Sequence, residues 1–495
     1  MFTRVLIANR GEIAVRLIRG CREIGIDTVA IYSEADATAP HVLAADDAVC
    51  VGPPPSAESY LSIERIIEAA QRTKCDAVHP GYGFLSENPV FAHAVGDAGL
   101  KFIGPRSEAI AAMGDKVAAR KRVAAVGVPV VPAVEEVADV GQLPRLAAEI
   151  GYPMLIKAAA GGGGKGMRIV RNEHELAPAF AAAGREATAA FGDGRLFVER
   201  YLDRPRHVEV QVLADEHGHI VHLGERECSI QRRHQKIIEE TPSPVLTPAL
   251  RTQMTAAAVA AARSVDYANA GTVEFLLDQD GRFYFLEMNT RLQVEHPITE
   301  LVTGIDLVHA QVRIAAGERL WLRQEDVQAR GHAIECRIYA EDAARHFLPS
   351  PGLIQCLHEP KGPGVRVDSG IRSGFEVTTH YDPMLAKLAV WGDTREAARR
   401  RMLCALGDYI VLGCTTAIPF LIEVLDHPAF VAGDTHTHYI EEHFPTWHPR
   451  ERHRMIAAIA AAIEGVRPPT SAGVSSAASP ASPWTTLGNW RLGQG

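Results

Sequence analysis

The sequence predicts an α/β protein with an N-terminal Rossmann-like domain built on a parallel sheet, a small α/β module and a large mixed α+β domain. Three features indicate this fold class: strand, turn, helix and strand in succession over 4–32, a glycine-rich loop between two strands at 154–170, and a long hairpin at 271–296. Strands that alternate with helices are typical of parallel sheets. With 495 residues, the chain is long enough for two to four domains.

Composition and charge narrow the class of function. Hydrophobic residues make up 47% of the chain, and 51 basic against 60 acidic side chains give a net charge of −9, which disfavours general binding of nucleic acid or anionic membranes. The eight cysteines form no C-x-x-C pair, and the sequence contains no apolar run long enough to span a bilayer and no secretory signal. We therefore expect a cytoplasmic protein without a membrane partner, in which Cys228 is a buried bystander.

The N-terminal domain is expected to span residues 1–113. Strands are predicted at 4–8, 27–32, 77–78 and 101–103, and helices at 13–24 and 62–72. No G-x-G-x-x-G follows the first strand, so the dinucleotide-binding fingerprint is absent. The loop His79–Asn88 is rich in glycine and polar residues and follows a strand, where open α/β sheets bind ligands.

A second region is expected over 114–203. It begins with a predicted helix at 113–126, and the predicted strands 154–157 and 167–170 flank the glycine-rich loop 161–166. Four successive glycines expose backbone N–H groups to a phosphate, and two lysines add positive charge, so we interpret the loop as a flap over phosphates. The alternative is a merely flexible loop. Residues 199–202 are expected to form a connecting segment.

The third region is expected over 204–446. His207, Glu209 and Gln211 alternate on one face of a predicted strand. Further along, four basic residues lie within five positions, and they form either a solvated face or an anion site. These residues are Arg232, Arg233, His234 and Lys236. A later predicted strand, 330–342, has Glu335, Arg337 and Tyr339 on one face, and a turn is expected at 347–352.

The hairpin at 271–296 is the most informative stretch. If Asp280-Gly281 forms a two-residue turn, Glu274 lies directly opposite Glu287, and Asn289 shares their face. Like charges directly opposite one another are destabilising, so a divalent cation with oxygen ligands is expected between them. The alternative is a solvated polar face. The alternation continues through side chains suited to a small oxyanion. These are Arg291, Gln293 and Glu295.

The order of these motifs resembles that of the biotin carboxylases, members of the ATP-grasp group. The resemblance covers residues 1–446 and includes N-R-G-E-I-A, H-P-G-Y-G-F-L-S-E-N, R-R-H-Q-K and E-M-N-T-R-x-Q-V-E-H. The chain is similar in particular to the biotin carboxylase subunits of bacterial acetyl-CoA carboxylases. This resemblance implies an ATP-grasp architecture with a lid domain at 114–203. It also implies ATP- and bicarbonate-dependent carboxylation of biotin through carboxyphosphate, which is the first half-reaction of acetyl-CoA carboxylase in fatty acid synthesis.

The resemblance also implies roles for individual residues. ATP is expected to contact Lys116, Lys157, Gly163, Gly164, Glu199, Arg200, Tyr201, Leu202, His207, His234, Glu274, Leu276 and Glu287. Two Mg²⁺ or Mn²⁺ ions are expected on Glu274, Glu287 and Asn289. Bicarbonate is expected on Lys236, Arg291, Gln293 and the backbone of Val294, with Glu295 as the general base. Arg337 is expected to stabilise the enolate of biotin, with Tyr82 and Asp382 near the biotin end of the pocket.

The partners follow from the same resemblance. The chain has no M-K-M sequence, so biotin is expected on a separate carrier protein that also serves carboxyltransferase subunits. Arg16, Arg19 and Glu23 match dimer positions of the family, while Pro363 replaces an aromatic residue there. Residues 447–495 are expected to form a helix, a Pro/Ser/Ala-rich linker and a tail. Three alternatives are another ATP-grasp ligase, the biotin carboxylase portion of a propionyl- or methylcrotonyl-CoA carboxylase, and a non-catalytic ATP-binding assembly protein.

Overall fold

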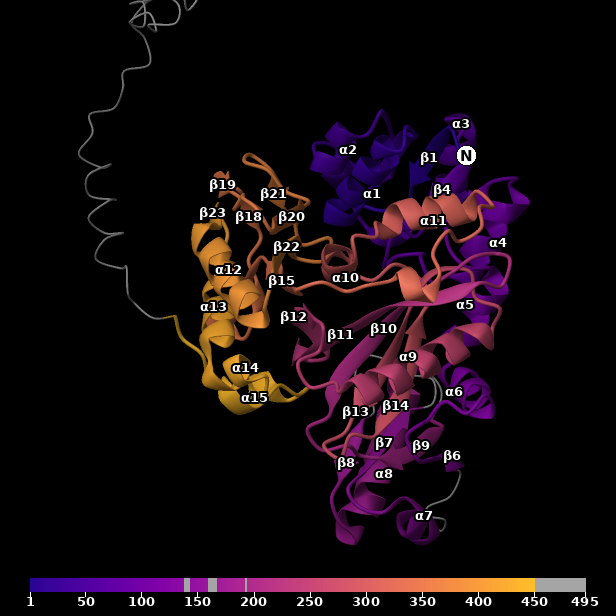
Figure 1. Ribbon diagram of the computed structural model, residues 1–495, viewed down its shortest axis with the longest axis vertical. Coiled ribbons are helices and arrows are strands. Elements are labelled where there is room, and N and C mark those ends of the chain that lie inside the picture. Colours follow the sequence, from indigo (N-terminus) through magenta and orange to yellow (C-terminus); the bar gives the residue numbers. More distant parts are fainter. Residues whose placement is uncertain (138–142, 159–166, 192–193, 450–495) are drawn as a thin grey trace, which may run out of the picture. The chain divides into compact units, whose positions relative to one another are not determined.

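The computed structural model describes residues 1–137, 143–158, 167–191 and 194–449 (Figure 1). Residues 1–447 form one compact unit. The C-terminal linker and tail predicted within 447–495 lie outside the described residues from position 450 onward. Within the described ranges, no helix has both the length and the apolar character that crossing a membrane requires.

A five-stranded parallel sheet forms the N-terminal part, with strand order β3-β2-β1-β4-β5. Its strands are β1 (Arg4–Ile7), β2 (Asp27–Ser33), β3 (Asp47–Gly52), β4 (Ala77–His79) and β5 (Lys101–Phe102). Its helices are α1 (Gly11–Glu23), α2 (Pro40–Ala44), α3 (Ile63–Arg72), α4 (Pro89–Asp97) and α5 (Ser107–Gly114). The predicted parallel sheet is confirmed, and β3 is a strand that the sequence patterns did not reveal.

The central strand β1 is buried on both faces. Val5 and Ile7 belong to one hydrophobic cluster, with side chains of α1 and α11 (Leu307–Ala315). Leu6 points to the other face and packs in a cluster with side chains of α3 and α4. Burial on both faces explains why parallel strands read as nearly continuous apolar runs rather than as an alternation.

His41 of α2 is fully buried against β2, where its ring Nε2 donates to the carbonyl oxygen of Ile31 over 3.2 Å. Burial lowers the pKa of His41 from 6.5 to about 4. Between these two pH values the unfolded chain binds the extra proton and the folded chain does not, so stability falls as the pH drops. From pH 7 to pH 5 this residue should cost about 2 kcal/mol of folding free energy.

We therefore expect His41→Phe to reduce the dependence of the melting temperature on pH between 7 and 5. Thermal unfolding at both pH values measures this slope. His93→Gln is the matched control, because the His93 side chain is 66% exposed beside Asp97. If His41→Phe leaves the wild-type slope unchanged, the buried neutral imidazole does not contribute to acid sensitivity.

The prediction of one helix over 113–126 is wrong at its start, because two helices meet there. Gly114 ends α5, and α6 (Lys116–Ala125) begins after Asp115. The Asp115 carboxylate accepts hydrogen bonds from the backbone N–H groups of Val117 (3.0 Å) and Ala118 (2.9 Å). An Asp that caps the first turn favours a new helix start, and glycine is a poor residue for continuing the old one.

A four-stranded antiparallel sheet follows, with strand order β6-β9-β7-β8. Its elements are β6 (Ala133–Val137), α7 (Leu143–Ile150), β7 (Met154–Ala158), β8 (Arg168–Val170), α8 (Glu173–Phe191) and β9 (Leu196–Arg200). The two strands predicted on either side of the glycine-rich loop are confirmed, and they pair with each other. Residues 161–166 of the loop itself lie outside the described residues.

The largest sheet has eight antiparallel strands in the order β14-β13-β10-β11-β12-β15-β22-β20. They are β10 (Arg206–Ala214), β11 (Ile220–Arg232), β12 (Gln235–Thr241), β13 (Asn269–Leu277), β14 (Phe283–Asn289), β15 (His332–Tyr339), β20 (Val365–Ser369) and β22 (Met384–Gly392). Because β12 and β15 are neighbours in this sheet, residues that lie about 100 positions apart in sequence come into contact.

Helices cover this sheet, with α9 packed on β10 and β11, and α12 packed on β15 and β22 (Figure 1). The helices are α9 (Pro248–Arg263), α10 (His296–Thr303), α11, α12 (Arg395–Asp408), α13 (Ile418–Asp426), α14 (Pro428–Ala432) and α15 (Tyr439–His443). Short strands are β16 (Glu341–Asp342), β17 (Leu348–Pro349), β18 (Gly352–Leu353), β19 (Cys356–His358), β21 (Glu376–Val377) and β23 (Ile410–Leu412). The turn predicted at 347–352 therefore contains strand residues, since β17 pairs with β16 and β18 with β21.

The β13–β14 hairpin corrects one prediction and confirms another. The two-residue turn at Asp280-Gly281 is wrong, because the Asp278 N–H donates to the Arg282 carbonyl (2.8 Å) and residues 279–281 form the loop. Gly281 has a φ of 79°, as three-residue hairpin loops require. A bulge in β14 then shifts the pairing by one residue. Glu274 therefore lies opposite Glu287, as predicted.

Candidate active site

A row of carboxylates crosses the large sheet where β10, β13 and β14 lie side by side. Glu209 pairs in register with Glu274, and Glu274 pairs with Glu287. Glu209 and Glu274 are buried. Like charges directly opposite one another destabilise a sheet, so the row requires positive charge nearby.

Lys236 of β12 supplies that charge. Its Nζ donates to carboxylate oxygens of Glu209 (2.5 Å), Glu274 (2.8 Å) and Glu295 (2.7 Å). Burial alone would lower the pKa of Lys236, but the carboxylates outweigh burial and raise it well above its ordinary value. Burial would raise the pKa of Glu274 and Glu295, yet Lys236 holds both well below the ordinary value. Lys236, Glu274 and Glu295 are therefore all charged near neutral pH.

Oxygen ligands gather at the β13–β14 end of the row. Asn289 Nδ2 donates to Glu274 Oε1 (2.9 Å), and Lys116 Nζ lies 3.3 Å from Glu287 Oε2. His207 Nε2 lies 2.9 Å from the other oxygen of Glu274. Carboxylate and amide oxygens are the ligands that Mg²⁺ and Mn²⁺ prefer, so Glu274, Glu287 and Asn289 fit a hard divalent cation.

Arg291 joins this end of the row to the N-terminal domain. Its Nη2 donates to Asn289 Oδ1 (2.7 Å), its Nη1 to Gln293 Oε1 (2.6 Å) and its Nε to Glu87 Oε2 (2.9 Å). Gln293 Nε2 in turn donates to Glu274 Oε1 (2.9 Å). Strand β14 ends at Asn289, so the predicted strand alternation does not continue through Arg291 and Gln293. The two side chains nevertheless join one connected network, with a forked cation beside an amide.

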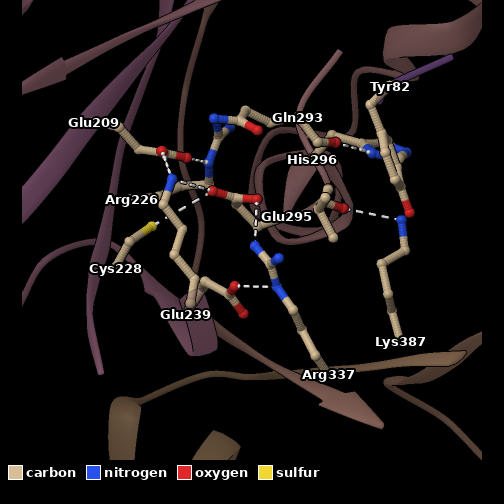
Figure 2. A network of polar contacts seen from close by, with 12 residues as sticks. Tyr82, Glu209, Arg226, Cys228, Glu239, Gln293, Glu295, His296, Arg337 and Lys387 are labelled. Atoms are coloured by element: carbon tan, nitrogen blue, oxygen red, sulfur yellow. Dashed lines mark hydrogen bonds and ion pairs between the residues drawn. The ribbon is translucent and has the colours of Figure 1, made fainter. Parts of the chain in front are cut away.

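Glu295 lies at the centre of a second network (Figure 2). Its Oε1 accepts from Lys236, while its Oε2 accepts from Arg337 Nη2 over 3.0 Å. Arg337 Nε donates to Glu239 Oε1 (2.6 Å). The Cys228 thiol is 3.8 Å from Glu295, and burial raises its pKa well above the ordinary value, so the thiol stays protonated. The prediction that Cys228 is buried is confirmed.

A cavity of about 530 Å³ opens beside this network. Arg291, Val294 and Arg337 line one side, and Tyr82 and Asp382 line it with residues of α1 and of the loop before β22. Tyr339 also faces the cavity, so the predicted side of β15 is confirmed for Arg337 and Tyr339. Segments that are distant in the sequence thus meet around one space large enough for a small ligand.

Comparisons with known proteins agree with this geometry. Three family models match the chain, "Biotin carboxylase, N-terminal domain" at 1–110, "Carbamoyl-phosphate synthase L chain, ATP binding domain" at 115–323 and "Biotin carboxylase C-terminal domain" at 335–442. The biotin carboxylase of Halalkalibacterium halodurans is 53% identical over 444 residues, which cover 90% of this chain and 98% of that protein. The chain belongs to the biotin carboxylase family.

Other relatives serve different complexes. One pyruvate carboxylase subunit, from Methanothermobacter thermautotrophicus, is 52% identical over 444 residues, which cover 90% of each chain. A solved structure of the biotin carboxylase domain dimer of Hydrogenobacter thermophilus 2-oxoglutarate carboxylase, in complex with MgADP, ADP and bicarbonate, has 49% identity and a TM-score of 0.84. It covers 90% of this chain and 98% of that one. The predicted ATP-grasp fold is confirmed, and this biotin carboxylase is an ATP-dependent carboxylating ligase.

The residues predicted to hold ATP in this biotin carboxylase come together in part. Lys157 Nζ forms an ion pair with Glu199 across β7 and β9. Leu276 packs on an apolar cluster that contains Leu202. The segment 199–202 is not wholly a connection, since β9 continues to residue 200.

Other predicted nucleotide residues lie apart or outside the described part of the chain. Gly163 and Gly164 lie outside the described residues. Arg200 is exposed, and the Tyr201 hydroxyl lies 2.9 Å from His438 Nε2. The nucleotide roles of these residues stay predictions.

The anion site proposed at residues 232–236 stays a prediction, and in the structure the β11–β12 turn separates the four basic side chains. Arg233 and His234 have positive φ angles of 50° and 67° and are exposed at the turn. Arg232 donates to Glu341 (3.0 Å). Only Lys236 of this group contacts the carboxylate row in the structure.

Three residues of the biotin carboxylase networks were not predicted from the sequence to belong to the site. Glu87 lies in the predicted ligand-binding loop, so its position gave a usable signal. Glu239 lies three positions after Lys236, a spacing that strand alternation assigns to opposite faces. Fully buried Arg226 donates to Glu209 (2.5 Å) and Gln211 (2.8 Å) through its guanidinium, and no local pattern marks it.

Proposed function

We propose that this biotin carboxylase uses ATP, bicarbonate and a divalent cation to carboxylate the biotin of a carrier protein by way of carboxyphosphate. The observation that carries the proposal is the contact of Glu295 with both Lys236 and Arg337 beside the cavity. Lys236 is a cation suited to the bicarbonate oxyanion, and the forked guanidinium of Arg337 suits the enolate of biotin. A carboxylate base between them, Glu295, can therefore serve both the activation of bicarbonate and the carboxylation of biotin. The bound MgADP and bicarbonate of the Hydrogenobacter thermophilus relative support the same ligands.

In this proposal ATP contacts Lys116, Lys157, the segment 199–202, His207 and Leu276, with the glycine-rich loop over its phosphates. Glu274, Glu287 and Asn289 would hold two Mg²⁺ or Mn²⁺ ions. When bound there, the ions neutralise the charge that develops on the phosphate oxygens during phosphoryl transfer. The hydrogen bonds from Lys236 and Asn289 to Glu274 Oε1 support this assignment, because they already hold the carboxylate in place.

Bicarbonate would be held by Lys236, Arg291, Gln293 and the backbone of Val294. Glu295 takes the bicarbonate proton, and the resulting oxyanion attacks the γ-phosphorus as ADP leaves. Carboxyphosphate then separates into CO₂ and phosphate, and the phosphate accepts the N1 proton of biotin. N1 attacks CO₂ while Arg337 stabilises the enolate oxygen.

Glu287→Gln should raise the Mg²⁺ concentration needed for half-maximal ATP cleavage by about tenfold or more, because a neutral amide is a weaker ligand for a hard cation. Titration of Mg²⁺ at saturating ATP measures this. Glu216→Gln is the control, since Glu216 pairs with Lys101 away from the row. An unchanged Mg²⁺ requirement in Glu287→Gln would remove Glu287 from the proposed metal site.

Biotin must come from outside these residues, because the 495 residues contain no M-K-M sequence. We assign the chain to an acetyl-CoA carboxylase of fatty acid synthesis, with carboxyltransferase subunits as partners. The second candidate is another carboxylase, such as a propionyl- or methylcrotonyl-CoA type. It is favoured by a relative named propionyl-CoA carboxylase alpha chain, from Ruegeria pomeroyi, which is 49% identical over 492 residues that cover 94% of this chain and 72% of that protein.

We also propose a homodimer, in line with the dimer of the Hydrogenobacter thermophilus relative. Arg19 and Glu23 have side chains that are 46% and 50% exposed and remain available to a partner. Arg16 is buried and bound to Glu300 (3.0 Å) and Asp306 (2.6 Å), so it would support such an interface from within the chain. Light scattering of the purified chain tests this assignment.

Labelled bicarbonate tests the proposed activity. The purified chain with MgATP and free biotin should form acid-labile labelled carboxybiotin, and omission of ATP or bicarbonate should abolish the label. Adding carboxyltransferase partners with a series of acyl-CoA acceptors and pyruvate then decides which acceptor is used. Folded protein that cleaves ATP without labelling biotin would contradict the proposed acceptor.

A further inference from the structure

One buried lysine that has no role in the proposed chemistry contacts the backbone of residues 293–295. These residues, which are proposed to hold bicarbonate, are called the bicarbonate loop below. Lys387 of β22 has a fully buried side chain, and its Nζ donates to the carbonyl oxygen of Val294 over 2.9 Å (Figure 2). The same Nζ lies 3.3 Å from Glu12 Oε2 at the start of α1. A single cation thus ties the loop before α10 to the N-terminal domain.

Glu12 extends this contact to the other side of the cavity. Its second carboxylate oxygen accepts a hydrogen bond from the Tyr82 hydroxyl. Lys387 Nζ also lies 5.7 Å from the centre of the Tyr82 ring. Tyr82, Val294 and Glu12 itself line the cavity, so the contact between Glu12 and Lys387 connects two of its walls.

The loop 293–295 is held through its carbonyl groups. His296 Nδ1 lies 2.8 Å from the Gln293 carbonyl oxygen, and Lys387 binds the next carbonyl along. Burial keeps His296 neutral by lowering its pKa well below the ordinary value, so the ring acts as a hydrogen-bond donor and not as a cation. Two adjacent fixed carbonyls determine the direction in which the Gln293 and Glu295 side chains leave the backbone.

Such a buried ion pair is an expensive way to stabilise a fold, because desolvation of the two charges offsets much of their attraction. The charge of Lys387 is further balanced by Asp368, its register partner on β20, which is bound to Arg366 (2.8 Å). A well-packed apolar pair would stabilise this position at least as well. An apolar pair could not form the hydrogen bond from Lys387 to the Val294 carbonyl or accept the one from the Tyr82 hydroxyl to Glu12.

We propose that Lys387 and Glu12 are positioning residues that hold the bicarbonate loop and couple it to the side of the cavity lined by Tyr82, where biotin, the acceptor of the carboxyl group, would bind. This inference rests on the proposed function. Lys387→Met and Glu12→Gln should each raise the KM for bicarbonate in ATP cleavage by about tenfold or more, with the KM for ATP changed by less than about twofold. They should also reduce any effect of free biotin on the bicarbonate KM.

Arg395→Met is the matched control. Like Lys387, Arg395 is paired with a glutamate, Glu240, and donates to the backbone, in its case to two carbonyls, but it lies outside the cavity lining. It should lower the melting temperature and leave the bicarbonate KM within about twofold. Glu12→Gln preserves the shape of the side chain but removes its charge and one of its two acceptor oxygens, so it provides the test if Lys387→Met does not fold.

Hydrogen–deuterium exchange gives a readout that does not depend on turnover. Amides of residues 293–296 should exchange faster in both variants than in wild type, and those of the Arg395→Met control should not. An active wild type with unchanged bicarbonate KM and unchanged exchange in both variants would overturn the positioning pair. A folded wild type without bicarbonate-dependent ATP cleavage would contradict the proposed function instead, while the exchange result would still decide the structural role.

Discussion

Glu295→Gln is expected to lower bicarbonate-dependent ATP cleavage by about 10²–10⁴-fold, the usual contribution of a general base. One carboxylate oxygen of Glu295 is bound to Lys236 (2.7 Å) and the other to Arg337 (3.0 Å). An amide of the same shape turns an NH₂ group toward one of these cations and cannot accept the bicarbonate proton. The loss should therefore appear in kcat, with the KM for ATP within about twofold of wild type.

Cys228→Ala is the matched control for this variant. The thiol is buried 3.8 Å from the same carboxylate, yet it is protonated and takes no part in the proposed chemistry. Its removal should change the rate by less than about threefold. If Glu295→Gln keeps wild-type kcat with bicarbonate, another group must be the base, and the proposed order of proton transfer is wrong.

The parts of the site that the sequence predicted correctly depend on strand periodicity. Alternation puts Glu287 and Asn289 on one face, and pairing across the hairpin sets Glu274 against them. The prediction of the opposed pair was correct although the turn was not, because the bulge in β14 compensates for the three-residue loop. A local pattern therefore gave the right pair through an incomplete account of the backbone.

The parts that the sequence did not predict depend on contacts between distant segments. Glu239 meets Arg337 because β12 and β15 are neighbours in the sheet, and strand order has no local signature. Glu12 meets Lys387 because α1 packs beside β20 and β22. In both cases a buried charge needs a partner, and only the tertiary fold determines which residue provides it.

Arg337→Lys is expected to reduce carboxybiotin formation by about 10²–10³-fold, while ATP cleavage with bicarbonate alone falls by less than about tenfold. The guanidinium binds Glu239 through Nε (2.6 Å) and Glu295 through Nη2 (3.0 Å), and it still lines the cavity. A lysine ammonium is a single point of charge. It can neutralise the two carboxylates, which preserves folding, but it cannot keep both contacts and also reach a developing enolate oxygen.

The control for this variant is Arg395→Lys, which makes the same change at a partly buried arginine paired with a glutamate, Glu240. It should leave both activities within about threefold of wild type. Separate assays of ATP cleavage and of labelled carboxybiotin distinguish the two steps. Equal losses in both assays for Arg337→Lys would mean that Arg337 acts mainly by orienting Glu295. A selective loss of carboxybiotin would mean that the guanidinium acts on the acceptor, as its place between the base and the cavity predicts.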